Sequence, residues 1–297
     1  MGLKLENVHK SYKKKKAVAG ISFELKEPGV FGLLGTNGAG KTTTIRMILG
    51  ILKKDEGSIT WNGEPVTREH VNFGYLPEER GIYPKAKVSE QLIYFAMLKG
   101  MSRKAASESL LKWAKKLEVE EYLNMSAEKL SKGNQQKVQF LTCVMHNPQL
   151  IVLDEPFSGL DPINTDILKR VINELIKDGK YIIMSSHQMA SVEEFCDEIL
   201  ILNRGKTVLQ GNLHAIKNAY EVKKLLIETK MPIKEIIKAN KYRFLEQKQD
   251  TYIIALDKVE DAQEIINTLT KEGIMLSKFE LLKPTLHDIF VEKVGDK

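Results

Sequence analysis

The sequence predicts an α/β fold organised around a glycine-rich phosphate-binding loop, followed by a small α+β domain. The loop, residues 35–42, reads Gly-Thr-Asn-Gly-Ala-Gly-Lys-Thr and fits the pattern G-x-x-x-x-G-K-[ST] at every fixed position. Residues 30–34 before it have the apolar character of a short buried strand, and residues 43–49 after it that of a helix. Residues 150–155 and 181–187 predict two more buried strands.

The chemistry of this loop suits phosphate. Glycines let backbone N–H groups curl around an anion, and the positive end of the following helix points at the same group. Lys41 is expected to reach the outer phosphates and the Thr42 hydroxyl to hold Mg²⁺. An ordinary glycine-rich turn is the alternative, but the flanking strand and helix favour a nucleotide site. The predicted nucleotide-binding residues are Gly35, Thr36, Asn37, Gly38, Ala39, Gly40, Lys41, Thr42 and Thr43.

Length and composition are those of a soluble globular protein with one to three domains. The chain has 297 residues, of which 42% are hydrophobic and 28% charged. No run of 18 apolar residues occurs, so no membrane-spanning helix is expected, and the N-terminus has no apolar signal region. Cys143 and Cys196 lie in apolar stretches, which predicts buried free thiols in a reducing compartment.

The net positive charge belongs to the first part of the chain. Residues 1–220 carry 31 basic and 25 acidic side chains, a net charge of +6, whereas residues 221–297 carry 14 of each. A basic region can indicate nucleic acid binding, but these lysines are scattered and no aromatic residues interleave with them. We interpret the one run, Lys13 to Lys16, as a solvated turn between two strands, and expect no nucleic acid partner.

An antiparallel β region is expected next to the loop. Residues 3–8 alternate like a half-buried strand, residues 17–25 resemble its antiparallel partner, and residues 57–63 add a strand that ends in an Asn-Gly turn. Tyr12 lies between the first two strands, where its ring could stack on a purine base. A tyrosine exposed on the surface explains its position equally well.

A helical insertion separates the loop from the next αβ unit. Residues 73–78 predict a strand, and helical patterns follow at 90–99 and at about 103–117. A third helix opens within residues 130–136, Leu-Ser-Lys-Gly-Asn-Gln-Gln, and ends before Pro148.

Polar residues follow the ends of the later buried strands. Asp154 ends one strand beside the phosphate-binding loop (P-loop) of residues 35–42. In ATPases with a P-loop, an aspartate in this arrangement holds a metal ion. Glu155 comes next, where a base could act on a water that attacks a γ-phosphate. His187 lies just past another strand at the same sheet edge, although a lone histidine is more often structural. A tight turn into a helix follows the two carboxylates, formed by Ser158, Gly159, Leu160 and Asp161.

Over about residues 1–220 these segments resemble the ATP-binding cassette (ABC) ATPase family. Residues 130–135 resemble the family signature LSGGQ, residues 150–154 resemble Walker B, and residues 158–161 match the D-loop. The resemblance implies a P-loop NTPase fold with an antiparallel β subdomain and a helical subdomain at about residues 85–148. It also implies ATP and Mg²⁺ as ligands. The residues with implied roles outside the P-loop are Tyr12 (adenine stacking), Glu155 (catalytic base) and His187 (switch histidine).

The resemblance further implies a partner cassette, because two cassettes of this family pair head to tail with ATP between them. Ser131 and the N–H group of Gly133 would contact a γ-phosphate bound by the P-loop of the other copy, again at a helix N-terminus. A second copy of this chain, or a homologous subunit, is therefore expected. The signature residues acting in trans are Ser131, Lys132, Gly133, Asn134 and Gln135.

The sequence departs from the family pattern at two places. In the signature, Lys132 replaces the usual Gly and Asn134 the usual Gln, but Ser131 and Gly133 remain, so a competent site is expected. At the Q-loop, Glu78 replaces the usual Gln. A carboxylate is also a good Mg²⁺ ligand, so Glu78 joins Thr42 and Asp154 as an expected metal residue.

Residues 75–84, the signature and residues 284–290 resemble the ATPase subunits of bacterial sodium-efflux and drug-resistance exporters. The expected function is ATP hydrolysis coupled to transport through a separate integral membrane permease, with the chain peripheral on the cytoplasmic face of the membrane. One alternative is a soluble ABC ATPase acting on ribosomes or DNA; those typically have two cassettes or a long coiled-coil insertion, and this chain has neither. A regulatory module without turnover is disfavoured because both hydrolytic positions are filled.

The loop after the Q-loop is the expected permease contact. Ile82 and Tyr83 are apolar, lack strand or helix periodicity and lie between Gly81 and Pro84. Folding back into the helical subdomain is the alternative for both side chains. Basic residues that would guide association at the rim are Arg80, Lys85 and Lys87.

Residues 221–297 predict a separate α+β domain. The order of strand-like and helical patterns is βαββαβ, that of a ferredoxin-like module. No cluster of metal-ligating residues and no glycine-rich loop occurs in it. A packing or dimerisation module is expected, with a ligand-sensing regulator as the alternative.

Overall fold

The computed structural model describes residues 2–13, 15–67, 71–79, 81–221 and 223–295, which form two compact units. The units are Met1–Gly211 and Asn212–Lys297, so the division falls before the boundary at 220/221 that the sequence suggests. Helix α7 (Leu213–Asn218) belongs to the second unit, where Lys283 donates a hydrogen bond to the Asn218 side chain. Lys14 of the lysine run and Arg80 of the expected docking loop lie outside the described residues.

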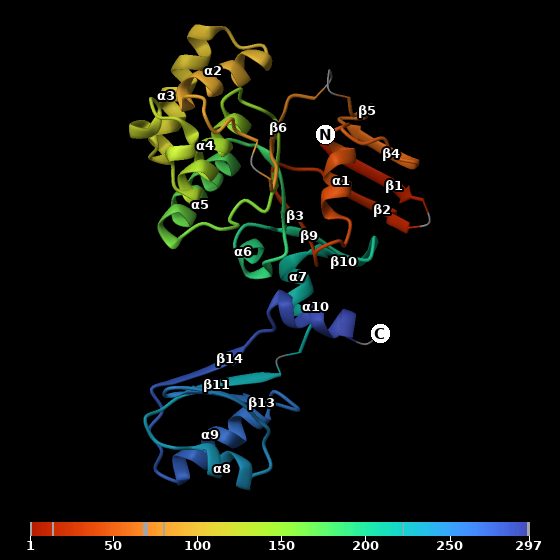
Figure 1. Cartoon of the computed structure of the whole chain (residues 1–297). Coiled ribbons are helices and arrows are strands. Elements are labelled where there is room, and N and C mark those ends of the chain that lie inside the picture. The colour runs from red at the N-terminus through yellow and green to blue at the C-terminus, as the bar shows by residue number, and fades with distance from the viewer. Residues whose placement is uncertain (1, 14, 68–70, 80, 222, 296–297) are drawn as a thin grey trace. The chain divides into compact units, whose positions relative to one another are not determined.

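A six-stranded sheet forms the centre of the first unit, in the order β10-β9-β3-β8-β7-β6 (Figure 1). Strand β3, which leads into the P-loop, has every residue buried and pairs in parallel with β8 and β9. Apolar runs in parallel strands are typical of a sheet covered on both faces. The strands are β3 (Gly29–Gly35), β6 (Phe73–Leu76), β7 (Leu150–Asp154), β8 (Tyr181–Ser186), β9 (Glu198–Asn203) and β10 (Lys206–Asn212).

The antiparallel β region is confirmed as a second sheet, in the order β2-β1-β4-β5. Its strands extend beyond the periodic segments in the sequence, so Tyr12 is the last residue of β1 rather than part of a connection. Tyr12 and Lys15 are directly opposite each other where β1 and β2 begin to pair. The strands are β1 (Leu3–Tyr12), β2 (Lys15–Leu25), β4 (Glu56–Trp61) and β5 (Glu64–Pro65).

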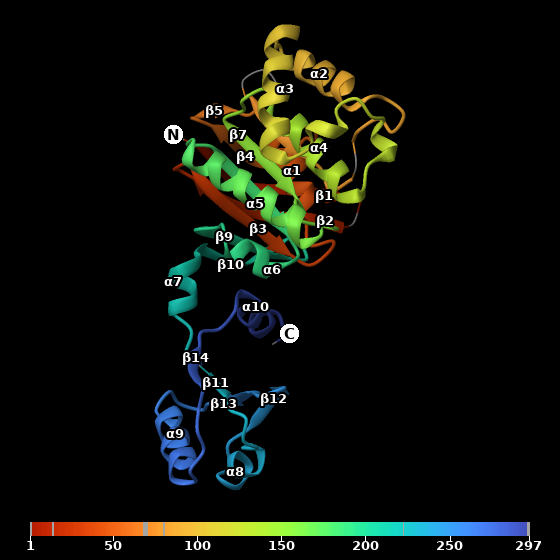
Figure 2. The same ribbon diagram turned by 90° about the vertical axis from the view of Figure 1, so that its left-hand side faces the viewer.

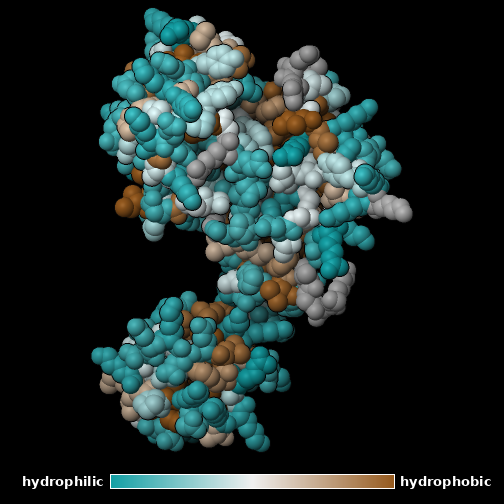
Figure 3. All heavy atoms as spheres, viewed as in Figure 1, coloured by the Kyte–Doolittle hydropathy of each residue, from teal (hydrophilic) through white to brown (hydrophobic). Residues whose placement is uncertain are grey.

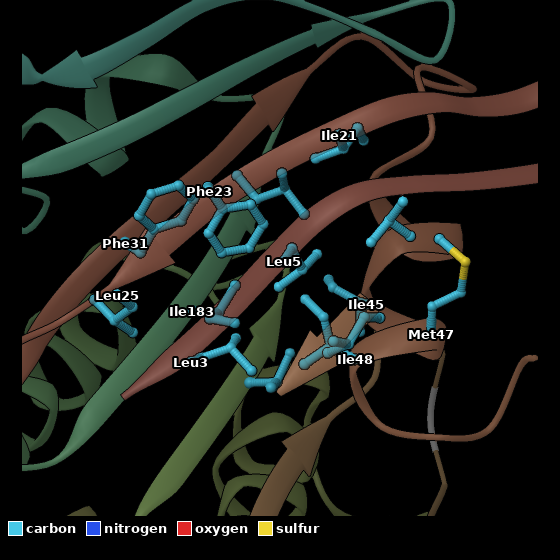
Figure 4. Packing of buried hydrophobic residues seen from close by; sticks show 14 of the residues in the cluster. Leu3, Leu5, Ile21, Phe23, Leu25, Phe31, Ile45, Met47, Ile48 and Ile183 are labelled. Carbon is cyan, nitrogen blue, oxygen red and sulfur yellow. The ribbon is translucent and has the colours of Figure 1, made fainter. Parts of the chain in front are cut away.

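The main core of this unit lies between the two sheets and the P-loop helix α1 (Lys41–Ile48). Figure 4 shows Leu3, Leu5 and Phe23 of the antiparallel sheet pointing toward Phe31 and Ile48. The rings of Phe23 and Phe31 are stacked with centroids 4.3 Å apart. Full burial of each such side chain is worth roughly 1.5–3 kcal/mol, and this packing fixes the strand from which the P-loop emerges.

The helical subdomain gathers α2, α3 and α4 at one end of the first unit (Figures 1 and 2). Helix α3 has the predicted bounds, whereas α2 begins two residues before the predicted 90, at Val88. The remaining helices of this unit include α5, which buries Ile167, Val171 and Leu175 on one face. Their bounds are α2 (Val88–Leu98), α3 (Arg103–Leu117), η1 (Glu120–Tyr122), η2 (Ala127–Lys129), α4 (Lys132–Val144), α5 (Pro162–Lys177) and α6 (Met189–Glu193).

The second unit has the predicted βαββαβ order and a sheet in the order β12-β13-β11-β14, which confirms the ferredoxin-like module. Leu225, Ile227 and Ile254 of the sheet pack with Ile265 and Leu269 in one apolar core. A further helix, α10, follows the module. The elements are β11 (Lys224–Glu228), α8 (Lys234–Ala239), β12 (Phe244–Lys248), β13 (Thr251–Ala255), α9 (Asp261–Lys271), β14 (Lys278–Leu282) and α10 (Leu286–Gly295).

Hydrophilic residues dominate the face of the molecule in Figure 3, with apolar residues scattered among them. Within the described ranges, no helix has the combined length and apolar character that crossing a membrane requires.

Candidate nucleotide-binding site

A pocket of about 370 Å³ lies where the P-loop, the end of β7 and the β1–β2 hairpin meet. It brings together predicted residues from four separate parts of the sequence. Tyr12, the P-loop from Asn37 onward and the three carboxylates all line it, as the sequence predicts for a nucleotide site. The lining residues are Tyr12, Lys15, Ala17, Asn37, Gly38, Ala39, Gly40, Lys41, Thr42, Thr43, Glu78, Asp154 and Glu155.

The P-loop is held in a form that only glycine allows at its last turn. Gly40 caps helix α1 with a φ of 111°, and a Cβ there would lie 2.5 Å from the Ala17 carbonyl oxygen. Lys41, the first residue of α1, is buried, and its Nζ donates to the carbonyl oxygens of Gly35 at 2.8 Å and Thr36 at 3.5 Å. Gly35 and Thr36 therefore orient the lysine, although neither lines the pocket.

Two buried carboxylates line the same pocket as this lysine. Asp154 ends β7 and accepts hydrogen bonds from Ser185 and from the Thr42 hydroxyl, the latter at 3.3 Å. Glu155 lies 3.8 Å from the Lys41 Nζ and has a φ of 52°, a left-handed conformation that costs a non-glycine residue about 1–3 kcal/mol. Such conformations cluster at functional sites because the surrounding structure must hold them.

His187 and the end of β8 hold the Glu155 carboxylate. The Glu155 Oε1 lies 2.8 Å from the His187 ring Nδ1 and accepts a hydrogen bond from the His187 backbone N–H at 2.8 Å. The Glu155 Oε2 accepts a hydrogen bond from the Ser186 hydroxyl at 3.1 Å. His187 is half-exposed and does not itself line the pocket. The histidine is thus paired with Glu155, the predicted base.

The carboxylates are crowded enough to disturb one another. Burial raises the pKa of Asp154, the Ser185 and Thr42 hydrogen bonds oppose that rise, and the negative charges of Glu78 and Glu155 add to it. A cation beside Asp154 would remove this penalty, because it stabilises the ionised carboxylate.

Lys15 and Ala17 also line the pocket, and nothing in the sequence singles them out. Lys15 belongs to the run that the sequence assigns to a solvated turn, but it is the first residue of β2. The pairing of Lys15 with Tyr12 across the hairpin decides this position. The strand register separates Lys15, which lines the pocket, from Lys16, which does not.

The signature residues do not line the pocket. Ser131 caps α4 by accepting the Asn134 N–H at 3.2 Å, and the Gln135 amide donates to the carbonyl oxygens of Ala127 and Leu130. Gly133 packs against the D-loop side, where a Cβ would lie 2.7 Å from the Asn164 Nδ2. Asn164 in turn donates to Asp161, which caps α5.

The comparisons with known proteins agree with this geometry. The family model described as ABC transporter matches residues 18–158, and one described as ATP-binding protein DrrA1-3-like, C-terminal domain, matches residues 211–294. The uncharacterized ABC transporter ATP-binding protein YhaQ of Bacillus subtilis (strain 168) is 45% identical over 294 residues, covering 99% of this chain and 98% of YhaQ. The chain belongs to the ABC ATPase family.

Solved ABC cassettes have the same fold as the first unit. One is described as the ATP-binding subunit of an ABC transporter; it is 30% identical, with a TM-score of 0.67, and covers 73% of this chain and 92% of its own. Another is described as the dimeric structure of MJ0796, a bacterial ABC transporter cassette; it is 23% identical, with a TM-score of 0.66, and covers 71% of this chain and 98% of its own. This ABC cassette is therefore an ATPase with the fold of known transporter subunits.

Proposed function

We propose that this chain is the ATP-binding and ATP-hydrolysing subunit of an ABC exporter, and that it drives a separate integral membrane permease from the cytoplasmic face of the membrane. The observation that carries the proposal is a pocket lined by Lys41, Asp154 and Glu155, in which Glu155 is also held by His187. The Tyr75–Pro84 resemblance to sodium-efflux and drug-resistance subunits makes sodium ions and drugs the candidate cargo.

In the proposed reaction, Lys41 leaves its backbone contacts to bind the outer phosphates, and Tyr12 stacks on the adenine. Glu155 accepts a proton from the attacking water, and His187 holds the Glu155 carboxylate in place. Thr42, Asp154 and Glu78 supply the hydroxyl and carboxylate oxygens that Mg²⁺ prefers, and the crowding of negative charge at Asp154 favours a cation there. Bound Mg²⁺ would neutralise charge on the phosphates.

The signature lies outside the pocket, which supports a site completed by a second copy. Ser131 and the N–H of Gly133 stand at the N-terminus of α4, where backbone donors and the helix dipole attract anions. The dimer of the MJ0796 cassette provides a precedent for such pairing. The second copy is either this chain or a homologous subunit.

The proposed permease contact is a groove of about 310 Å³ beside the Q-loop. Ile82 and Phe95 line it, and Tyr83, which is 59% exposed, stacks on the Phe95 ring with centroids 5.9 Å apart. Tyr83 thus extends an apolar surface without being buried by the helical subdomain. Lys85 and Lys87 are exposed beside it and would guide an acidic partner segment.

Copurification from detergent-solubilised membranes tests the proposal. The wild-type chain is expected to retain an integral membrane protein, and the change of Ile82 and Tyr83 together to serine is expected to release it while ATP binding stays unchanged. Leu111→Ser is the matched control, because Leu111 is 61% exposed on α3 but does not line the groove. Recovery of ribosomes or DNA instead of a membrane protein would favour a soluble ABC ATPase.

A further inference from the structure

Two buried glutamines hold the segment between β6 and α2, and they hold different parts of it. Gln91 of α2 accepts the Tyr83 N–H at 2.9 Å and donates to the carbonyl oxygens of Tyr83 and Ala86. Gln139 of α4 donates from its Nε2 to the carbonyl oxygens of Pro77 at 3.3 Å and Glu79 at 3.0 Å. The two carbonyls that Gln139 binds are those on either side of Glu78.

The geometry of Gln139 identifies its amide nitrogen as the part that matters. Both partners are carbonyl oxygens, which accept only, so the nitrogen must face them. Within the described residues, the Oε1 atom of this 2% exposed side chain has no hydrogen-bond partner. A buried acceptor without a partner is unfavourable, and an apolar side chain of the same length would avoid that cost. Packing alone therefore does not explain a glutamine here.

We propose that Gln139 is a positioning residue for Glu78: its amide fixes the backbone on both sides of Glu78 and so aims that carboxylate into the nucleotide pocket. The inference rests on the proposed role of Glu78 at the metal. Neither Glu78 nor Gln139 is a signature or P-loop residue, and Gln139 acts on Glu78 only through the backbone carbonyls of Pro77 and Glu79.

The same contact connects two functional segments of the first unit. Ser131, the signature serine, caps the start of helix α4, and Gln139 lies about two turns further along, at roughly 12 Å. Because Gln139 is hydrogen-bonded to the Q-loop backbone, a shift of α4 is expected to move Glu78 as well. Positioning of Glu78 thus depends on the helix whose start is proposed to meet the nucleotide of the other copy.

The test compares Mg²⁺-dependent nucleotide binding among variants. A non-hydrolysable ATP analogue is titrated in Mg²⁺ and in EDTA. The readout is the dissociation constant in EDTA divided by that in Mg²⁺, which measures how much Mg²⁺ strengthens binding. Outer-shell changes at metal sites typically cost about 10–100-fold, so Gln139→Met is expected to lower the ratio by about tenfold or more, as is Glu78→Ala. Affinity in EDTA should stay near the wild-type value.

Gln91→Met is the matched control. It also removes a buried amide that binds this segment, but at Tyr83 and Ala86 rather than next to Glu78. It is expected to change the ratio less than about twofold, within the spread of independent sites. The double variant of Glu78→Ala and Gln139→Met should be no worse than Glu78→Ala alone, since both changes remove one function. If Gln139→Met does not fold, as judged by its thermal transition, Gln139→Asn, which keeps the amide but shortens its reach, carries the test.

The possible failures give different results. A wild-type ratio in Glu78→Ala would overturn the proposed metal role of Glu78. A lowered ratio in Glu78→Ala but not in Gln139→Met would overturn the positioning role of Gln139. Equal losses in Gln139→Met and Gln91→Met would also overturn it, because then the glutamines only stabilise the segment.

Discussion

The two units of the chain treat buried polar groups in opposite ways. In the first unit Lys41, Asp154 and Glu155 are each 7% exposed or less. Glu155 also has a left-handed backbone conformation. In the described part of the second unit, Thr229 is the one buried polar residue, and the core is aliphatic and aromatic. Ionisable groups are costly to bury unless neighbours compensate them, so a cluster of three at one edge of a sheet is typical of a functional site.

The difference predicts that changes in the two units affect different observables. Changes at the first unit's pocket should alter turnover and nucleotide affinity, and changes in the second unit's core should alter stability. Variants in each unit test this separation, beginning with the largest expected effect.

Glu155→Gln should give the largest effect, a loss of about 10²–10⁴-fold in phosphate release, since a positioned base is removed. ATP binding should persist, and light scattering should detect an ATP-dependent dimer that an added Ser131→Arg change prevents. Glu90→Gln, at an exposed position of α2, is the control and should hydrolyse ATP normally. Near-normal phosphate release by Glu155→Gln would contradict the assignment of the base.

Ile265→Ala should destabilise the second unit by about 2–5 kcal/mol, because the side chain is fully buried in its core. Denaturant unfolding measures the loss, and Gln263→Ala, at an exposed position of the same helix, should change stability little. Nucleotide affinity should remain at the wild-type value. A loss of nucleotide affinity that parallels the loss of stability would contradict the prediction that changes in the two units affect different properties.

Lys15→Ala should weaken ADP binding by about two- to fivefold, equivalent to roughly 0.4–1 kcal/mol for an exposed charge at the pocket mouth. Lys16→Ala is the matched control from the same run, because Lys16 does not line the pocket. Titration of a fluorescent ADP analogue measures both, and added salt should shrink the difference. Equal losses in the two variants would mean that the run acts only through its total charge.

Asp288→Asn should have the smallest effect, below about 1 kcal/mol because the pair is partly exposed. Burial disfavours the Asp288 carboxylate, but Lys224 and Thr285 outweigh it and lower its pKa from 3.8 to about 2. A lowered pKa gives stability that is present above about pH 4 and lost as the pH falls toward 2. The wild-type advantage in unfolding free energy should therefore be constant from pH 7 to 5; a decline in that range would exclude Asp288 as its source.

The sequence alone determined the P-loop, the two carboxylates at the end of β7, the histidine after β8 and the βαββαβ order of the tail. These features are local: fixed spacing within a loop, apolar runs of strand length and turn residues at element ends carry them. Local pattern also predicts the antiparallel sheet, though it ends β1 at residue 8, because the last residues of the strand do not alternate clearly.

The tertiary structure decided which side chains meet. Lys15 enters the pocket through the β1–β2 register, Gly133 is required by the approach of Asn164, and Gln139 binds carbonyl oxygens some sixty residues earlier in the chain. A backbone carbonyl is the same whatever its residue, so its partner leaves no pattern in the sequence. Contacts of this kind depend on how helices and strands pack, and they are settled only when the chain is folded.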